Sequence, residues 1–211
     1  MRKIIQLLLA VAIVGLIYVI YVLISTPIQF DTDRARVEAQ VVDRIKDIRL
    51  AERAYKSKYQ EFTGDFDKLI NFVLNDSLKM DRKIVDEDDS LGMAQLKQSG
   101  RKNIESFFVA VRDTVFSPKK LNEAQIRDLR FIPGTNSKTE YMLESGKITT
   151  ESKVVIPIVE CKAPYVQYLD TVAYHQEIIN LIDNDVNNYN KYPGIKFGSM
   201  EGGNNEAGNW E

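Results

Sequence analysis

Residues 4–24 read IIQLLLAVAIVGLIYVIYVLI, and this uncharged stretch decides how the chain is organised. An α-helix rises about 1.5 Å per residue, so the stretch is about 30 Å long and matches the hydrocarbon core of a bilayer. Tyr18 and Tyr21 lie toward its C-terminal end, where amphipathic rings favour the membrane interface. A cleaved signal peptide is the alternative, but the apolar run is long for a signal h-region and no A-x-A site follows. The sequence therefore predicts one transmembrane helix that contacts membrane lipid.

The charges around this stretch indicate its direction. Arg2 and Lys3 precede it, whereas no Lys or Arg follows before Arg34. Positively charged flanks tend to stay in the cytoplasm. We therefore expect residues 1–3 to form a cytoplasmic stub and the domain to lie on the other side of the membrane.

A second, amphipathic helix is predicted from Asp33 to Tyr59. Pro27 is expected to end the membrane helix, because proline cannot continue the hydrogen-bond ladder, and residues 25–32 then form a juxtamembrane link. Beyond the link, apolar residues recur at steps of three and four, the pattern of one buried helix face. Glu52 is expected to pair with Lys56 one turn later. The apolar stripe consists of Val37, Val41, Ile45, Ile48, Ala51, Tyr55 and Tyr59.

This stripe is expected to pack on the domain's own sheet, and a coiled-coil seam or partner helix in its N-terminal half is the alternative. Residues 33–200 are predicted to form one α+β domain with a mainly antiparallel sheet, followed by a polar tail over 201–211. Ser145-Gly146 is expected to be a hairpin turn. Further helices are predicted at 66–75, 122–129 and 174–190, and strands at 80–85, 107–116, 130–132, 139–143, 147–150, 153–159 and 195–197.

Composition limits the chemistry. The formal net charge is −2 with interleaved acids and bases, so no basic stripe indicates a nucleic-acid site. His175 and Cys161 are the single residues of their kinds, and no nucleophile, phosphate-loop or metal-ligand motif occurs. We therefore expect no enzyme activity, cofactor or metal. A ligand-binding module lined by Tyr141, Tyr165 and Tyr168 is one alternative, and a tethered hydrolase using Glu144, Glu151 or Glu160 is the other.

The tail ends in Trp210-Glu211, and Trp210 is the only tryptophan of the chain. A large apolar ring on a polar segment docks on its own domain or in a partner's pocket, since aromatic anchors dominate interface energies. Both docking readings stay open, and a disordered tail of no consequence is the remaining alternative. The residues expected to contact partner proteins are Trp210, Glu211, Arg44, Val37 and Val41.

The N-terminal architecture resembles that of type IV pilins and pseudopilins. A membrane helix precedes the segment DRIKDIRLAERAYKSKYQEFTGDFDKLINFV (43–73), whose Ala51, Ala54, Tyr55 and Tyr59 are similar to the AxxAYxxxxGxY-like end of a pilin helix. The prepilin-peptidase motif is absent, so single-pass pilus or secretion assembly proteins that lack it are the nearer likeness. The resemblance implies a role in an assembly rather than polymerisation.

A second resemblance covers the whole chain. The segments at 47–73, KAPYVQYL (162–169), NKYPGIKFGSM (190–200) and NNEAGNWE (204–211) are similar to a family of single-pass envelope proteins from Bacteroidota. It implies an inner-membrane protein with a periplasmic domain, and it brings no activity or site residues. The expected function is a non-enzymatic protein that binds other envelope proteins, and an oligomer is compatible with this.

Overall fold

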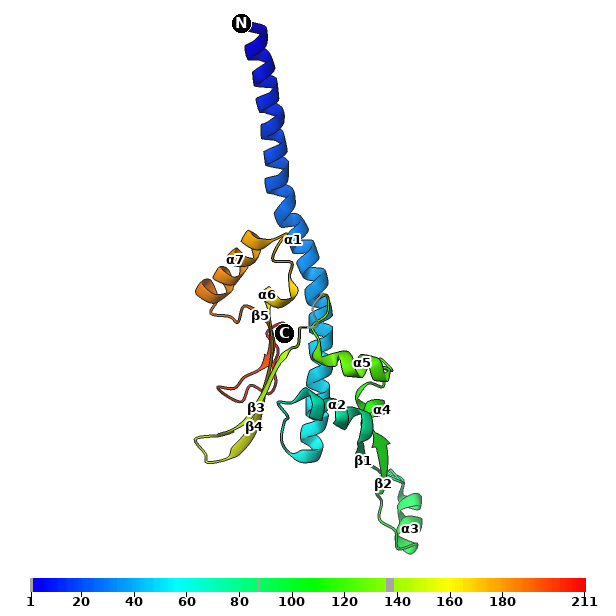
Figure 1. Ribbon diagram of the computed structural model, residues 1–211. Helices are drawn as coiled ribbons and strands as arrows, with labels where there is room; N and C mark the ends of the chain where they lie inside the picture. Colours follow the sequence, from blue (N-terminus) through cyan, green and yellow to red (C-terminus); the bar gives the residue numbers. More distant parts are fainter. Residues whose placement is uncertain (1, 87, 136–138) are drawn as a thin grey trace.

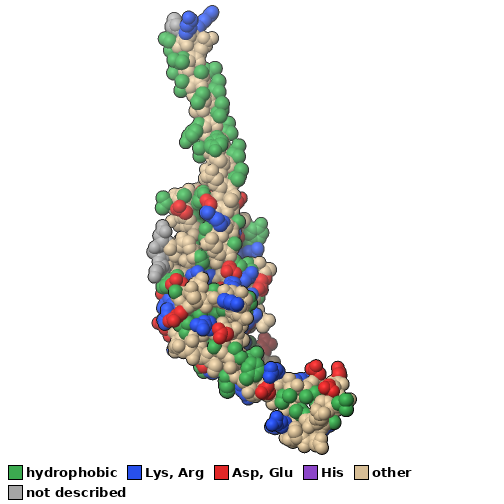
Figure 2. All heavy atoms as spheres, turned by 90° about the vertical axis from the view of Figure 1, so that its right-hand side faces the viewer, with side chains coloured by type: hydrophobic (Ala, Val, Ile, Leu, Met, Phe, Trp, Pro, Cys, Tyr) green, Lys and Arg blue, Asp and Glu red, His purple; other side chains and the backbone are tan. Residues whose placement is uncertain are grey.

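The computed structural model describes residues 2–86, 88–135 and 139–211 and has the expected α+β fold. Helix α1 (Arg2–Tyr59) dominates it (Figure 1). Its N-terminal half projects away from the domain and is long and apolar enough to cross a membrane. Apolar side chains cover this half on the face shown in Figure 2. Because these side chains are exposed in the described structure, a lipid environment suits them.

Helix α1 is unbroken. The prediction of a non-helical link at 25–32 is therefore wrong, because these residues are helical. Pro27 lies inside the helix. Proline removes a single backbone hydrogen bond, and the residues around it keep the helical path. The hydroxyls of Ser25 and Thr26 donate to carbonyls one turn earlier, at 2.8 and 2.9 Å, as in helices that must satisfy their polar groups internally. The membrane segment and the amphipathic segment therefore form one rod.

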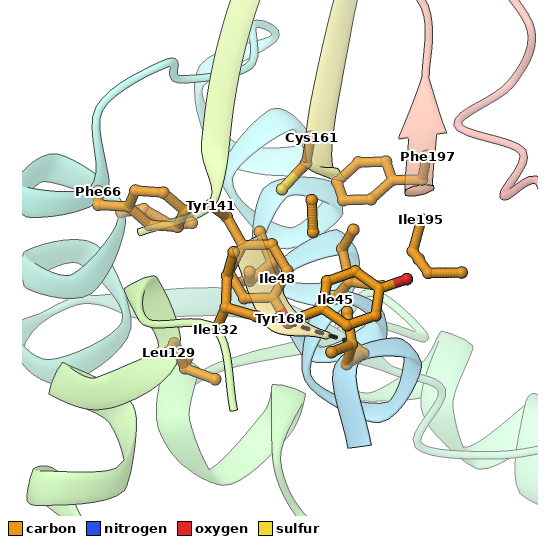
Figure 3. Close-up of a cluster of buried hydrophobic side chains, with 14 of the residues drawn as sticks. Ile45, Ile48, Phe66, Leu129, Ile132, Tyr141, Cys161, Tyr168, Ile195 and Phe197 are labelled. Atoms are coloured by element: carbon orange, nitrogen blue, oxygen red, sulfur yellow. Dashed lines mark hydrogen bonds between the residues drawn. The ribbon is translucent and has the colours of Figure 1, made fainter. Parts of the chain in front are cut away.

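The apolar stripe of α1 is the spine of the core, as predicted. Val41, Ile45, Ile48 and Ala51 have no exposed surface. They pack in one cluster with helix α2 (Phe66–Asn75), whose N-terminus is capped by the side chain of Asp65. Figure 3 shows part of this cluster, including the hydrogen bond that the Tyr141 hydroxyl donates to the Val41 carbonyl at 3.1 Å.

Three antiparallel strands in the order β3–β4–β5 pack on the spine: β3 (Met142–Thr149), β4 (Val155–Pro164) and β5 (Gly194–Gly198). The hairpin turn expected at Ser145-Gly146 is wrong, because both residues lie inside β3, opposite Val159 and Ile158. A Cβ atom on Gly146 would lie 3.0 Å from the terminal methyl of Met200. The chain turns beyond Thr149 instead.

A second, two-stranded ribbon leaves the body beside α2. Strands β1 (Ser77–Arg82) and β2 (Glu105–Ala110) pair antiparallel, and helix α3 (Ser90–Gln98) lies between them in sequence. The strand predicted at 107–116 ends at Ala110 in the structure, because helix α4 (Val111–Val115) begins at the next residue. Val111 is fully buried. We call residues 77–110 the arm. It extends from the end of the molecule remote from the N-terminus (Figures 1 and 2).

Short helices complete the domain. Helix α5 (Glu123–Arg127) is capped at its N-terminus, where Asn122 and Gln125 exchange side-chain to backbone hydrogen bonds. The remaining helical elements are α5 (Glu123–Arg127), the 3₁₀ helix η1 (Asp128–Arg130), α6 (Tyr165–Tyr168), α7 (His175–Asp183) and the π-helical turn η2 (Asn184–Asn188).

Candidate functional site

The structure places the sequence-predicted contact residues against the chain's own body. Val41 is fully buried, so it is not available to a partner, and Val37 is partly buried against the core. Arg44 donates from Nη1 to the carbonyl oxygens of Asp128 and Phe131, at 2.8 and 3.1 Å. This face of α1 therefore holds the domain to the helix.

The C-terminal tail also docks on its own domain, one of the two outcomes left open by the sequence. Gly208 forms a bridge with Phe197, which adds the tail to the free edge of β5. The ring of Trp210 packs against the core, with the guanidinium of Arg49 over it at 5.4 Å from the ring centroid. Arg49 also forms an ion pair with Glu211 at 2.7 Å.

A second acidic residue of the tail also contacts α1. Glu206 accepts from Arg53 at 3.2 Å and from Lys56 at 3.3 Å. Lys56 therefore pairs with the tail and not with Glu52. The tail therefore engages three basic residues of α1, namely Arg49, Arg53 and Lys56.

The arm exposes several large apolar side chains. Phe108 is 73% exposed and Leu91 is 78% exposed. Cross-strand pairs place Met80 opposite Phe107 and Lys79 opposite Phe108, so both faces of the ribbon carry an aromatic ring. The exposed apolar residues of the arm are Met80, Ile84, Leu91, Ile104, Phe107 and Phe108. Such clustered exposure typically marks a protein contact.

The root of the arm is fixed to the end of α1. Asp76, directly before β1, accepts from the Tyr59 hydroxyl at 2.8 Å and forms an ion pair with Lys58. Its carbonyl oxygen accepts from the backbone amide of Val111 at 3.0 Å. Hydrogen bonds from Lys58 and Tyr59 lower the pKa of the Asp76 carboxyl, so it stays ionised and keeps these contacts. The rod and the arm are therefore joined by directional bonds.

The carboxylates considered for hydrolysis form no catalytic pair. Glu144 and Glu160 are cross-strand neighbours, and the Lys162 amino group lies 3.7 Å from Glu144 and 2.9 Å from Glu160. Although burial opposes ionisation, hydrogen bonds from Lys162 and Lys196 lower the pKa of Glu160. A general acid needs the opposite shift. Glu151 is exposed in the loop that follows β3.

Other candidate groups lie apart from one another. Burial raises the pKa of the fully buried Cys161 thiol, so it stays protonated and unreactive. His175 is exposed at the start of α7. Within residues 2–86, 88–135 and 139–211, no group of three His, Cys, Asp or Glu side chains is placed to hold a metal ion.

Of the tyrosines proposed to line a ligand pocket, Tyr168 lines the largest described cavity, whereas Tyr141 and Tyr165 do not. The Tyr141 hydroxyl is used in the core. The Tyr165 hydroxyl donates to Asp185 at 2.8 Å. The expected set of three rings is therefore not assembled around one pocket.

Sequence reasoning missed one buried carboxyl. Glu52 has no exposed surface, and its Oε2 atom accepts the backbone amide of Thr63 at 3.0 Å. Burial raises the pKa of Glu52 to about 8, although the Thr63 hydrogen bond partly opposes this. The position could have been found, because Glu52 follows Ile48 by four residues and continues the apolar stripe.

Comparisons with protein-family models, with curated proteins and with solved structures gave no match for this chain.

Proposed function

We propose that this chain is a non-enzymatic, single-pass inner-membrane protein whose periplasmic domain binds other envelope proteins through the arm. The apolar half of α1 anchors it in the lipid. The side of the membrane follows from the flanking charges and from the resemblance to envelope proteins of Bacteroidota. The single observation that carries the proposal is the cluster of exposed apolar side chains on the arm.

The unbroken rod supports this function. Residues 25–59 of α1 span about 50 Å at the rise of an α-helix. The arm is attached to the far end of this rod through Asp76, so it is held well away from the bilayer. A subunit of a membrane-spanning assembly needs this kind of reach toward partners.

The ribbon itself also favours a partner. A two-stranded ribbon is marginally stable in water, and three strands or a packed face are usually needed. Most side chains of β1 and β2 are exposed in the described structure. A protein partner with an apolar groove would cover the ring of Phe108 on its face of the ribbon.

A photo-crosslinking amino acid at position 108 is expected to give adducts with a defined set of envelope proteins in cells. The matched control is the same probe at Leu50, which is also apolar and exposed but lies on α1 away from the arm. Mass spectrometry would identify the adducts. Equal adducts from both positions, or intramolecular products alone from position 108, would contradict the proposal.

The substitution Phe108→Asp measures the energy of this contact. Phe108 is largely exposed, so the stability of the domain should change by less than about 0.5 kcal/mol. Loss of a central aromatic anchor typically costs about 2 kcal/mol or more of binding, which is roughly a 30-fold weaker association with the crosslinked partner. Binding measured with the purified partner would test this, with Leu50→Asp as the control.

A further inference from the structure

A turn at residues 170–173 joins α6 to α7. Figure 1 shows this connection beside α1, at the end of the domain that faces the N-terminal half of the helix. The carboxylate of Asp170 accepts the backbone amides of Val172 and Ala173, both at 3.0 Å, which fixes the path of the turn. All four residues are exposed. The turn is therefore an ordered projection at the membrane-facing end of the domain.

Phe30 sets the level of this end of the domain relative to the bilayer. With residues 4–24 in the hydrocarbon core, the Cα atom of Phe30 lies about 9 Å beyond that of Ile24 along α1. Side chains on a helix lean toward its N-terminus, so the Phe30 ring lies closer to the core than its backbone does. A headgroup layer is about 5–8 Å thick, and the ring therefore lies within it.

The domain covers Phe30 at this level. Phe30 is the first buried residue along the described part of α1, and it is only 6% exposed. The Tyr174 ring packs on it with centroids 5.3 Å apart, and the Tyr174 hydroxyl donates to Asp33 at 2.8 Å. Tyr174 directly follows the turn. Two contacts with α1 therefore hold the turn beside the headgroup layer.

An apolar side chain projects from the turn. Val172 is 92% exposed, so almost none of its side chain is covered by the protein. Ile28 lies two residues before Phe30 on α1 and is 61% exposed. Single exposed apolar side chains are common on protein surfaces that face water. At the level of Phe30 the surroundings are lipid headgroups, and burial of a valine among them is favourable.

The charges beside the turn restrict the kind of lipid surface that it can contact. Within 28–33 and 170–174 every charged residue is acidic, and these residues are Asp31, Asp33 and Asp170. Arg34, the next charged residue of α1, is paired with Glu38 at 2.8 Å. An anionic surface would repel the carboxylates, whereas a zwitterionic surface has no net charge. The partner that fits this end of the domain is therefore a zwitterionic lipid surface.

We propose that Val172 inserts into the headgroup layer of the bilayer that holds α1 and gives the domain a second membrane contact. The turn is continuous with the anchor through the packing of Tyr174 on Phe30. A single transmembrane helix can tilt in its bilayer. A contact beside the axis of α1 restricts this tilt and so fixes the direction in which the arm extends. The contact depends on the anchor and not on the proposed protein partner.

The test attaches a fluorophore to one introduced cysteine at a time, in the full chain in phosphatidylcholine nanodiscs. Cys161 is fully buried and stays unlabelled. Phosphatidylcholine with a nitroxide on its headgroup quenches a fluorophore that lies in the headgroup layer. We expect quenching at position 172 to match that at position 28 and to exceed that at position 154 by about threefold or more. Val154 is also an exposed valine, but it lies in the turn between β3 and β4, away from the membrane-facing end.

A variant ties the contact to Val172. With the fluorophore at position 171, Val172→Asp should lower the quenching by about threefold, because a carboxylate does not insert where a valine does. Val172 is almost fully exposed, so its replacement leaves the fold intact. Val154→Asp is the matched control and should leave quenching at position 171 unchanged. Adding phosphatidylglycerol to the discs should not increase the quenching.

Each other outcome overturns part of the proposal. Quenching at position 172 that is no stronger than at position 154 overturns the second membrane contact. If position 28 is also unquenched, the placement of the anchor is overturned with it, whereas crosslinking from position 108 tests the protein partner separately. Unchanged quenching at position 171 in Val172→Asp overturns the role of Val172. Quenching that requires phosphatidylglycerol overturns the choice of a zwitterionic surface.

Discussion

Replacing Glu52 by glutamine is expected to remove most of the domain's loss of stability between pH 5 and pH 8, so that the variant gains on the wild type as the pH rises. Glu52 is fully buried, and burial raises its pKa from 4.5 to about 8. Below about pH 4.5 the carboxyl is protonated in both folded and unfolded chains, so it carries no penalty. As the pH rises, the unfolded chain loses the proton first, and the free energy of unfolding falls.

The fall continues until the pH passes the folded-state pKa near 8. Its slope is at most about 1.4 kcal/mol per pH unit, which gives an upper limit of about 5 kcal/mol over the whole shift. Glutamine keeps an oxygen that accepts from the Thr63 amide but has no proton to lose. The glutamine side chain therefore keeps the hydrogen bond from Thr63, in the loop after α1, without burying a charge.

The measurement is urea unfolding of the full chain in mild detergent at several values of pH, followed by the fluorescence of Trp210. Glu144→Gln is the control, since its side chain is 54% exposed and its removal should leave the pH dependence unchanged. Wild-type protein whose pH profile matches that of Glu52→Gln would show that Glu52 is not the titrating group.

The second large effect is expected from Gly198→Ala. Gly198 ends β5 with φ at +76°, and a Cβ atom there would lie 1.9 Å from the carbonyl oxygen of Val159 in β4. Neither the new Cβ atom nor the Val159 carbonyl oxygen can rotate away, because both are fixed by the backbone. Strand β5 must therefore move away from β4, and its contact with the tail is disturbed. We expect a loss of about 3 kcal/mol or more.

Gly202→Ala is the matched control, because a Cβ atom there meets nothing within 4 Å. Its effect should stay within about 0.5 kcal/mol. Urea unfolding at one fixed pH compares the two variants with the wild type. If Gly198→Ala were as stable as Gly202→Ala, the described pairing of β5 with β4 would be wrong.

The elements that the sequence predicted well are those set by local patterns. The apolar run at 4–24 and the stripe from Val41 to Ala51 have strong helical signals, and both lie in α1. Helix α2 and strand β5 also lie where the sequence placed them. These segments bury one consistent face, so their periodicity survives tertiary packing.

The errors come from places where packing overrides a local signal. Ser145-Gly146 has turn chemistry, but both residues are paired with β4 inside β3. Pro27 is a helix breaker, yet the helix tolerates one missing bond. Glu52 has the chemistry of an exposed residue but occupies a core position. Each depends on contacts from distant parts of the chain.

The candidate site was less predictable than the fold. Phe107 and Phe108 lie in a run rich in strand-forming residues. A buried strand and an exposed ribbon have the same kind of sequence pattern, so the pattern does not distinguish them. The tail offered two readings, and only the structure shows that Arg49 and the core receive Trp210. Exposure of an apolar residue is decided by what packs on it, and one sequence does not contain that information.

The most direct test of the account is a depth profile of α1 in lipid bilayers. Spin labels placed one at a time from position 4 to position 40 report the access of oxygen, which enters the bilayer, and of a water-soluble nickel chelate, which does not. We expect high oxygen and low nickel access over 4–24, a crossover between 25 and 30, and a helical period that continues without a break through Pro27. Nickel access throughout 4–24 would contradict the anchor, and a lost period at 25–32 would contradict the single rod.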